Sequence, residues 1–158
     1  MNALVAYYSR TGTTRKVAEE LVSLLKCVSE EIHDTKNRKG ILGYLSAGKD
    51  ATSKNLTKLK KVNNDPASYD IVIIGTPTWS HTLSTPIRTY LTQYKDRFKK
   101  VAFFCTHQYT DGSPFEEMES TCGKTPVATL MLHSKKELEG DEYIKRAEEV
   151  VERIAISL

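Results

Sequence analysis

The fold is decided by residues 4–18, which read Leu-Val-Ala-Tyr-Tyr-Ser-Arg-Thr-Gly-Thr-Thr-Arg-Lys-Val-Ala. The apolar run at residues 4–8 predicts a buried strand, and apolar residues at helical spacing from Val17 to Leu25 predict a helix behind it. Between them lies a short polar loop in which four of six residues carry hydroxyl groups. This order directs the free N–H groups of a helix N-terminus to the space beyond the strand, where an anion is stabilised.

The hydroxyl-rich loop therefore predicts a phosphate cradle. Gly12 permits a backbone conformation that other residues avoid, and the hydroxyl groups add donors to those of the backbone. The residues assigned to this cradle are Ser9, Arg10, Thr11, Gly12, Thr13 and Thr14. The simpler alternative is a helix cap, but a cap needs a single hydroxyl and this loop offers four.

Other phosphate-binding patterns do not fit this loop. It lacks the triphosphate pattern G-x-x-x-x-G-K-[ST], and it has one glycine where the dinucleotide pattern G-x-G-x-x-G needs three. The first predicted strand does not end in the paired acids of a magnesium-dependent receiver domain. A Cys-x5-Arg phosphatase loop is excluded because the residue six positions beyond Cys105 is Asp111. A terminal phosphomonoester is the anion that several short hydroxyl donors suit best.

Length and composition predict one globular domain over residues 1–158, long enough to bury a core. No apolar run approaches the ~20 residues of a membrane span. The first residues show neither the basic region nor the cleavage site of a secretory leader, so we expect a cytoplasmic protein. The three cysteines have no C-x-x-C spacing and are expected to be small buried hydrophobes rather than disulfide or zinc ligands.

The rest of the chain alternates strands and helices. Further strands are predicted at residues 27–32, 71–75, 101–105 and 127–132, and helices from Pro86 and over 113–120 and 141–156. Residues 34–64 are predicted to hold a brief apolar turn at 41–47 and a short helix closed by Leu56 and Leu59. Five strands alternating with helices predict a three-layer α/β fold, in which helices cover both faces of a doubly wound parallel sheet.

Polar, irregular loops follow the first, third and fourth predicted strands. In a parallel sheet a ligand binds beyond the carboxyl ends of the strands, so we expect these loops to converge on one site. Trp79 and Tyr109 lie at the tips of the second and third loops. Large rings at exposed loop tips are unfavourable unless they cover something flat; the alternative is that each packs on its own loop. A cradle beside an aromatic slot implies a mononucleotide-like cofactor.

With these motifs the chain resembles the flavodoxin-like family of FMN-binding proteins over essentially its whole length. The resemblance is carried by Tyr7-Tyr8-Ser9-Arg10-Thr11-Gly12-Thr13-Thr14-Arg15 and Gly75-Thr76-Pro77-Thr78-Trp79, with weaker matches at residues 86–91, 104–106 and 115–118. It implies a five-stranded parallel sheet of strand order 2-1-3-4-5 and FMN held without a covalent bond. The cradle would bind the 5′-phosphate. The dimethylbenzene and N5 side would meet Pro77, Thr78, Trp79, Ser80 and His81, and the pyrimidine edge would meet Thr106, His107, Gln108 and Tyr109.

Two stretches depart from the family pattern. Relatives commonly have Gly where this chain has His81, and Ser-Gly-Gly where it has residues 107–109. The side chains that replace these glycines either crowd the flavin or supply new hydrogen bonds to it. His81 and His107 are also candidates for delivering a proton beside the flavin. A metal site is not expected, because the sequence offers no third ligand.

The resemblance implies an FMN-dependent redox protein, with a flavodoxin-type electron carrier as the leading hypothesis. The alternatives are an FMN-dependent oxidoreductase of the quinone or flavin reductase type, and a binding domain that has lost FMN. Redox partners would be a protein or a small-molecule electron acceptor. Residues 36–61 hold eight Lys or Arg against one acid, Asp50, and are expected to be either a solvated loop or a docking face for an acidic partner. Nucleic acid is not expected, because the stretch has a single aromatic residue for stacking.

Overall fold

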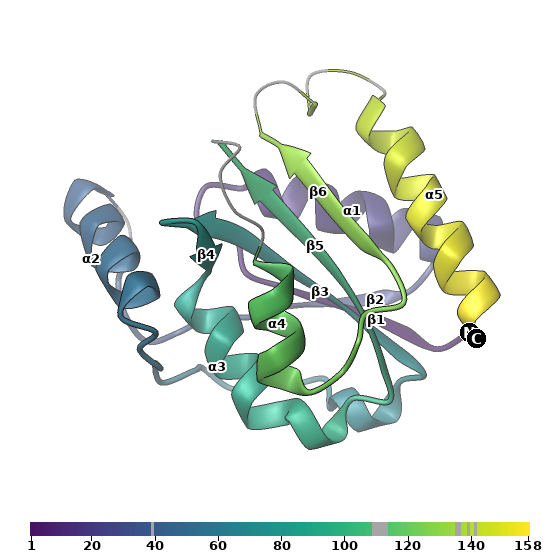
Figure 1. The fold of residues 1–158 in the computed structure, drawn as a ribbon, viewed down its shortest axis with the longest axis horizontal. Coiled ribbons are helices and arrows are strands. Elements are labelled where there is room, and N and C mark those ends of the chain that lie inside the picture. The colour runs from purple at the N-terminus through teal and green to yellow at the C-terminus, as the bar shows by residue number, and fades with distance from the viewer. Residues whose placement is uncertain (39, 109–113, 135–136, 139, 141) are drawn as a thin grey trace.

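A twisted parallel sheet forms the centre of the molecule (Figure 1). The computed structural model describes residues 1–38, 40–108, 114–134, 137–138, 140 and 142–158. The parallel strands are β1 (Ala3–Tyr7), β2 (Val28–Glu31), β3 (Ile71–Trp79), β5 (Lys100–His107) and β6 (Thr129–His133), in the order β2-β1-β3-β5-β6. The short strand β4 (Thr82–Leu83) pairs antiparallel with β3. Apart from this extra strand, the predicted parallel sheet and its order 2-1-3-4-5 are confirmed.

Helices cover both faces of the sheet, as predicted. One face packs against α1 (Thr13–Leu25) and α5 (Glu142–Ser157). The other face packs against α2 (Gly40–Thr52), α3 (Thr85–Tyr94) and α4 (Phe115–Cys122). Two short 3-10 helices, Pro66–Ser68 and Lys95–Arg97, precede β3 and β5. No helix in the described part of the chain is both long and apolar enough to cross a membrane.

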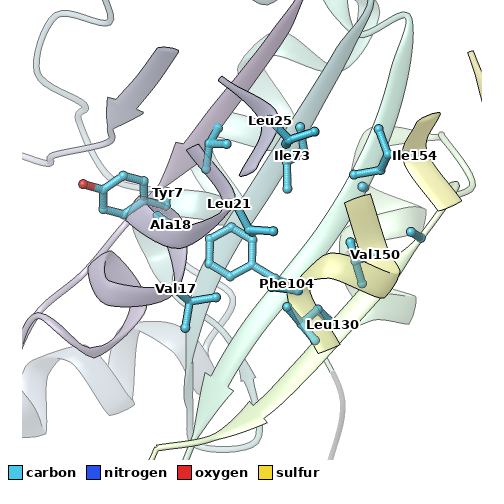
Figure 2. Packing of buried hydrophobic residues seen from close by; sticks show 14 of the residues in the cluster. Tyr7, Val17, Ala18, Leu21, Leu25, Ile73, Phe104, Leu130, Val150 and Ile154 are labelled. Atoms are coloured by element: carbon cyan, nitrogen blue, oxygen red, sulfur yellow. The ribbon is translucent and has the colours of Figure 1, made fainter. Parts of the chain in front are cut away.

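The apolar run at the start of β3 is buried on both sides, which explains its composition. Ile71 and Ile73 pack in the core under α1 and α5, whereas Val72 and Ile74 pack in the core under α2, α3 and α4. Figure 2 shows the first of these cores, in which the Phe104 ring lies among the side chains of α1 and α5. The same ring lies over Gly75, where an added Cβ would be 2.0 Å from Phe104 Cζ. This contact accounts for the glycine at the centre of the sheet.

Residues 34–64 differ most from the prediction. The expected brief turn is the thirteen-residue helix α2, and the expected short helix near Leu59 is instead an extended segment. That segment runs along the outer edge of β2 and beyond its end, where Lys60 N–H donates to the His33 carbonyl at 2.8 Å. The prediction failed because α2 buries small residues and exposes Ile41, Leu42 and Leu45. Among its buried positions are Ala47 and Ala51, whose two methyl groups contribute only about 1.6 kcal/mol of burial.

Candidate functional site

A cavity of about 670 Å³ lies at the carboxyl ends of the parallel strands. Its size is within the range of sites for small molecules and cofactors. The three predicted loops contribute Arg10, Thr11, Thr13, Thr14, Pro77, Thr78, Trp79, Ser80, His81, Thr106, His107 and Gln108 to its wall. The structure thus brings twelve of the fifteen predicted site residues into one cavity wall. Ser9 and Gly12 lie behind this wall in the first loop, and Tyr109 lies outside the described residues.

Some backbone N–H groups of the first loop and of the start of α1 are bonded within the loop, and others are not. Gly12 adopts a φ of 95°, and its carbonyl accepts the Lys16 N–H as the first bond of α1. The Ser9 hydroxyl accepts the N–H groups of Gly12 at 3.1 Å and Arg15 at 3.2 Å. The N–H groups of Thr13 and Thr14, in the first turn of α1, have no acceptor among the residues that the structure describes. Two free amides at the start of a thirteen-residue helix, beside hydroxyl groups, suit an anion such as a phosphate.

A buried hydrogen bond joins the first and third loops. Thr14 Oγ1 and Thr106 Oγ1 lie 2.8 Å apart, although the residues are separated by 92 positions in the chain. Both side chains are almost fully buried. This contact joins the start of α1 to the end of β5, so the first and third loops meet at one edge of the cavity.

Trp79 differs from its predicted place at an exposed loop tip. β3 continues past Gly75 to Trp79, and the indole is only 7% exposed. The ring meets Tyr8 edge to face at a centroid distance of 5.3 Å, and the Arg38 guanidinium lies over it at 5.3 Å. Burial raises the pKa of the Tyr8 phenol to about 12, so this neighbour is neutral at physiological pH. Trp79 therefore belongs to the inner wall of the cavity.

The first departure from the family pattern lies in the turn between β3 and β4. Ser80 and His81 are the two central residues of a hairpin in which Trp79 pairs with Thr82. Both have positive φ values, 47° and 65°, which is characteristic of a type I′ turn. Glycine is favoured in this turn because other residues are strained by roughly 1–3 kcal/mol in that region. The backbone shape that glycine favours is thus kept here by non-glycine residues.

The outer side of this hairpin is held by Glu117 of α4. Its carboxylate accepts hydrogen bonds from Thr82 of β4 and from Arg88 of α3, and the Arg88 Nη2–Glu117 Oε1 distance is 3.0 Å. Burial raises the pKa of Glu117, but the hydrogen bonds from Thr82 and Arg88 outweigh this effect and hold the pKa below its usual value. Glu117 is therefore a carboxylate at neutral pH, and it anchors the wall that carries Trp79.

His107 is paired with a histidine that the sequence analysis missed. His107 and His133 are opposite residues at the ends of β5 and β6, and their ring centroids are 5.3 Å apart. Only the strand register brings them together, so no local pattern could have revealed the pair. Among the described residues, no three His, Cys, Asp or Glu side chains gather in a group that could hold a metal ion.

Two further parts of the wall were missed. Ser134, directly after β6, has a buried hydroxyl that finds no hydrogen-bond partner in the described part of the chain. A hydroxyl two residues after the predicted fifth strand was the available signal. The helix α2 contributes Leu45, Ala47, Gly48, Lys49 and Thr52, and Ser53 follows directly after it. No sequence signal placed α2 here, because its apolar residues do not mark the buried face.

Cys105 lies at the end of the sheet but is not part of the cavity chemistry. Its side chain is 1% exposed, and burial raises the pKa of the thiol to about 12. A thiol of this kind is not a nucleophile at neutral pH. Cys122 is also buried, as expected for a small hydrophobe.

Comparison with known proteins identifies the family. A sequence model described as Flavodoxin matches residues 2–153. None of the curated protein sequences matches the chain.

Solved structures agree in fold. A flavoprotein from Lactobacillus acidophilus NCFM, solved in complex with FMN, is 26% identical over 87% of this chain and 96% of its own, with a TM-score of 0.71. The apo-form of the flavoprotein from the same organism is 25% identical over 87% of this chain and 95% of its own, with a TM-score of 0.64. A two-electron reduced flavodoxin from Megasphaera elsdenii is 16% identical over 95% of this chain and 98% of its own, with a TM-score of 0.61. The chain belongs to the flavodoxin family.

Proposed function

We propose that this chain binds FMN without a covalent bond in the cavity at the carboxyl ends of its strands. The observation that carries the proposal is the start of α1, where the amides of Thr13 and Thr14 have no acceptor among the described residues. A terminal phosphate supplies the acceptors that these donors need. The relative from Lactobacillus acidophilus, solved in complex with FMN, supports the choice of ligand.

The rest of the cavity suits the ring system of FMN. The wall formed by Pro77, Thr78 and Trp79 is largely apolar, and the wall from Thr106 to Gln108 is polar. We assign the first to the dimethylbenzene side and the second to the pyrimidine edge. The unpartnered hydroxyl of Ser134 is a further donor for a polar group of the bound molecule. When bound, FMN supplies one- and two-electron transfer, and the residues of this chain bind it, orient it and limit its contact with water.

We propose the role of an electron carrier whose partner is a protein with an acidic contact surface. Of the eight basic residues at 36–61, Lys36, Arg38 and Lys54 form ion pairs within the chain. Lys49, Lys58, Lys60 and Lys61 are exposed, and Lys49 lies in the cavity wall. Exposed lysines, one of them in the cavity wall, favour approach of an acidic surface and make the association rate sensitive to salt.

A second candidate is an FMN-dependent oxidoreductase acting on a small molecule. It is favoured by the contribution of α2 to the cavity, where Leu45 and Lys49 offer an apolar and a cationic contact beyond the three loops. These contacts suit an aromatic substrate with an anionic group. Direct turnover of a quinone with NADH or NADPH by the purified protein would support this candidate over the carrier.

The binding proposal is tested by comparing FMN with riboflavin, which lacks only the phosphate. Purified protein is mixed with each flavin and desalted, and its visible absorption spectrum is recorded. We expect FMN to remain with the protein and riboflavin to be lost or to bind at least tenfold more weakly, because the cradle contributes several hydrogen bonds. Equal retention of both flavins would contradict the assigned cradle, and loss of both would contradict FMN binding.

The carrier proposal is tested on the FMN-loaded protein by stepwise reduction. A semiquinone that persists during reductive titration is expected of a one-electron carrier. Rapid turnover with a small acceptor, without a detectable semiquinone, would instead support the oxidoreductase.

A further inference from the structure

Arg38 is a buried cation at the junction of two walls of the cavity. Its side chain is 3% exposed, and its Nε donates to Asp34 Oδ2 at 2.9 Å. Its Nη2 lies 3.0 Å from Asp50 Oδ2. A charge in this position is stable only when it is paired, so the two carboxylates fix the guanidinium in one place. Arg38 itself lies just ahead of α2, between Asp34 at the end of the β2 segment and Asp50 on α2.

The third partner of Arg38 is the only tryptophan of the chain. The guanidinium carbon lies 5.3 Å from the centroid of the Trp79 ring, a distance at which a cation is attracted to an aromatic face. Tyr8 meets the same ring edge to face. Trp79 is therefore held by Arg38 and Tyr8, while part of it still lines the cavity.

The link to α2 matters because the described part of that helix buries only small apolar side chains against the body of the protein. It buries the small residues Ala47 and Ala51, and it exposes Ile41, Leu42 and Leu45. Its fit is nevertheless close: a Cβ on Gly43 would lie 2.3 Å from the carbonyl carbon of Arg38. Burial raises the pKa of Asp50, but hydrogen bonds from Lys36 and Asn55 and the nearby Arg38 cation outweigh it and keep the pKa below its usual value. Asp50 thus stays charged and available to Arg38.

We propose that Arg38 is a positioning residue of the cofactor site, which joins Trp79 and α2 as adjoining walls of the cavity. Without the guanidinium, the indole loses the cation over its ring and Asp50 of α2 loses one of the two cations that pair with it. Both walls then become looser although no residue that lines the cavity has been changed. For its cofactor measurement, this inference rests on the proposed binding of FMN.

The test uses Arg38→Met, which keeps an unbranched chain of similar reach and removes the charge. The matched control is Arg97→Met, because Arg97 forms an exposed pair with Asp65 at 2.6 Å outside the cavity wall. Trp79 is the sole tryptophan, so its emission maximum and its quenching by acrylamide report on this wall directly, without any added flavin. Titration with FMN gives the dissociation constant, and circular dichroism verifies folding.

We expect Arg38→Met to shift the emission to the red, to increase quenching by acrylamide, and to raise the FMN dissociation constant roughly tenfold. Arg38→Lys keeps a cation over the ring and should restore part of each effect, and Arg97→Met should behave as the wild type. A folded Arg38→Met protein with wild-type emission, quenching and FMN affinity would overturn the proposal.

If Arg38→Met does not fold, a second variant tests the proposed role of Arg38. Asp50→Asn removes the carboxylate that α2 presents to both Arg38 and Lys36 and leaves Arg38 over Trp79, so it should weaken FMN binding with little change in emission. Unchanged FMN affinity in this variant would overturn the proposal. If the wild-type protein binds no FMN, the proposed function fails, whereas the quenching measurement still tests whether Arg38 holds Trp79.

Discussion

The buried contact between Thr14 and Thr106 allows a sharp test of how the cavity is held together. The side chains are 1% and 4% exposed, and their hydroxyl oxygens are 2.8 Å apart. Thr14→Val removes one hydroxyl with almost no change in shape and leaves the Thr106 hydroxyl buried without this partner. An unsatisfied buried hydroxyl costs about 1–3 kcal/mol. We therefore expect Thr14→Val and Thr106→Val each to lower the free energy of unfolding by about 2 kcal/mol.

The double variant distinguishes loss of the Thr14–Thr106 hydrogen bond from a general loss of stability. When both partners become apolar groups of the same shape, no unsatisfied group remains, and the change can be nearly neutral. The double variant should thus be close to the wild type, with a coupling energy of roughly 2–4 kcal/mol between the two sites. In a domain of this size, 2 kcal/mol corresponds to about 4–8 °C in the melting temperature.

The assay is urea unfolding of the protein without added flavin, followed by circular dichroism. Thr92→Val is the matched control, because its hydroxyl donates to the Arg88 carbonyl at an exposed position of α3. The control should change stability by less than about 0.5 kcal/mol. If the losses of the two single variants simply add in the double variant, the hydrogen bond is not what joins the two loops.

Three further predictions follow from single contacts. Gly75→Ala places a methyl group against the Phe104 ring and should cost roughly 1–3 kcal/mol in urea unfolding, whereas Gly140→Ala, in open space, should not. Because the folded-state pKa of Glu117 is lowered, its contribution to the free energy of unfolding is complete above the usual carboxylate pKa and is lost as the pH falls through the lowered value. Glu117→Gln should therefore make the free energy of unfolding less dependent on pH in the acid range. An unchanged pH dependence in that range would contradict this. Ser134→Ala removes a buried hydroxyl that has no partner among the described residues, so the free energy of unfolding without flavin should not fall, while the FMN dissociation constant rises about fivefold. An unchanged dissociation constant would remove Ser134 from the site.

The local patterns of the chain predicted the framework and the position of the site. The apolar run before Ser9 and the helical spacing after Gly12 defined a strand, a tight loop and a helix, and the structure has each of them. The β-branched run at residues 71–74 predicted a strand buried on both faces, which is where β3 lies. Such features can be read from sequence because side-chain period, turn chemistry and burial of a strand depend on residues close in the chain.

The tertiary structure decided which distant residues meet. Trp79 is buried because β3 extends into a hairpin and because Arg38, 41 positions away in the sequence, lies over its ring. The helix α2 packs on the sheet through the small residues Ala47 and Ala51 and adds a wall to the cavity, so its apolar pattern gave no indication of its place. His107 and His133 meet through the register of two strands. Register and helix docking are set by the packing of the whole core rather than by neighbours in sequence, so these contacts of the site become visible only in the folded chain.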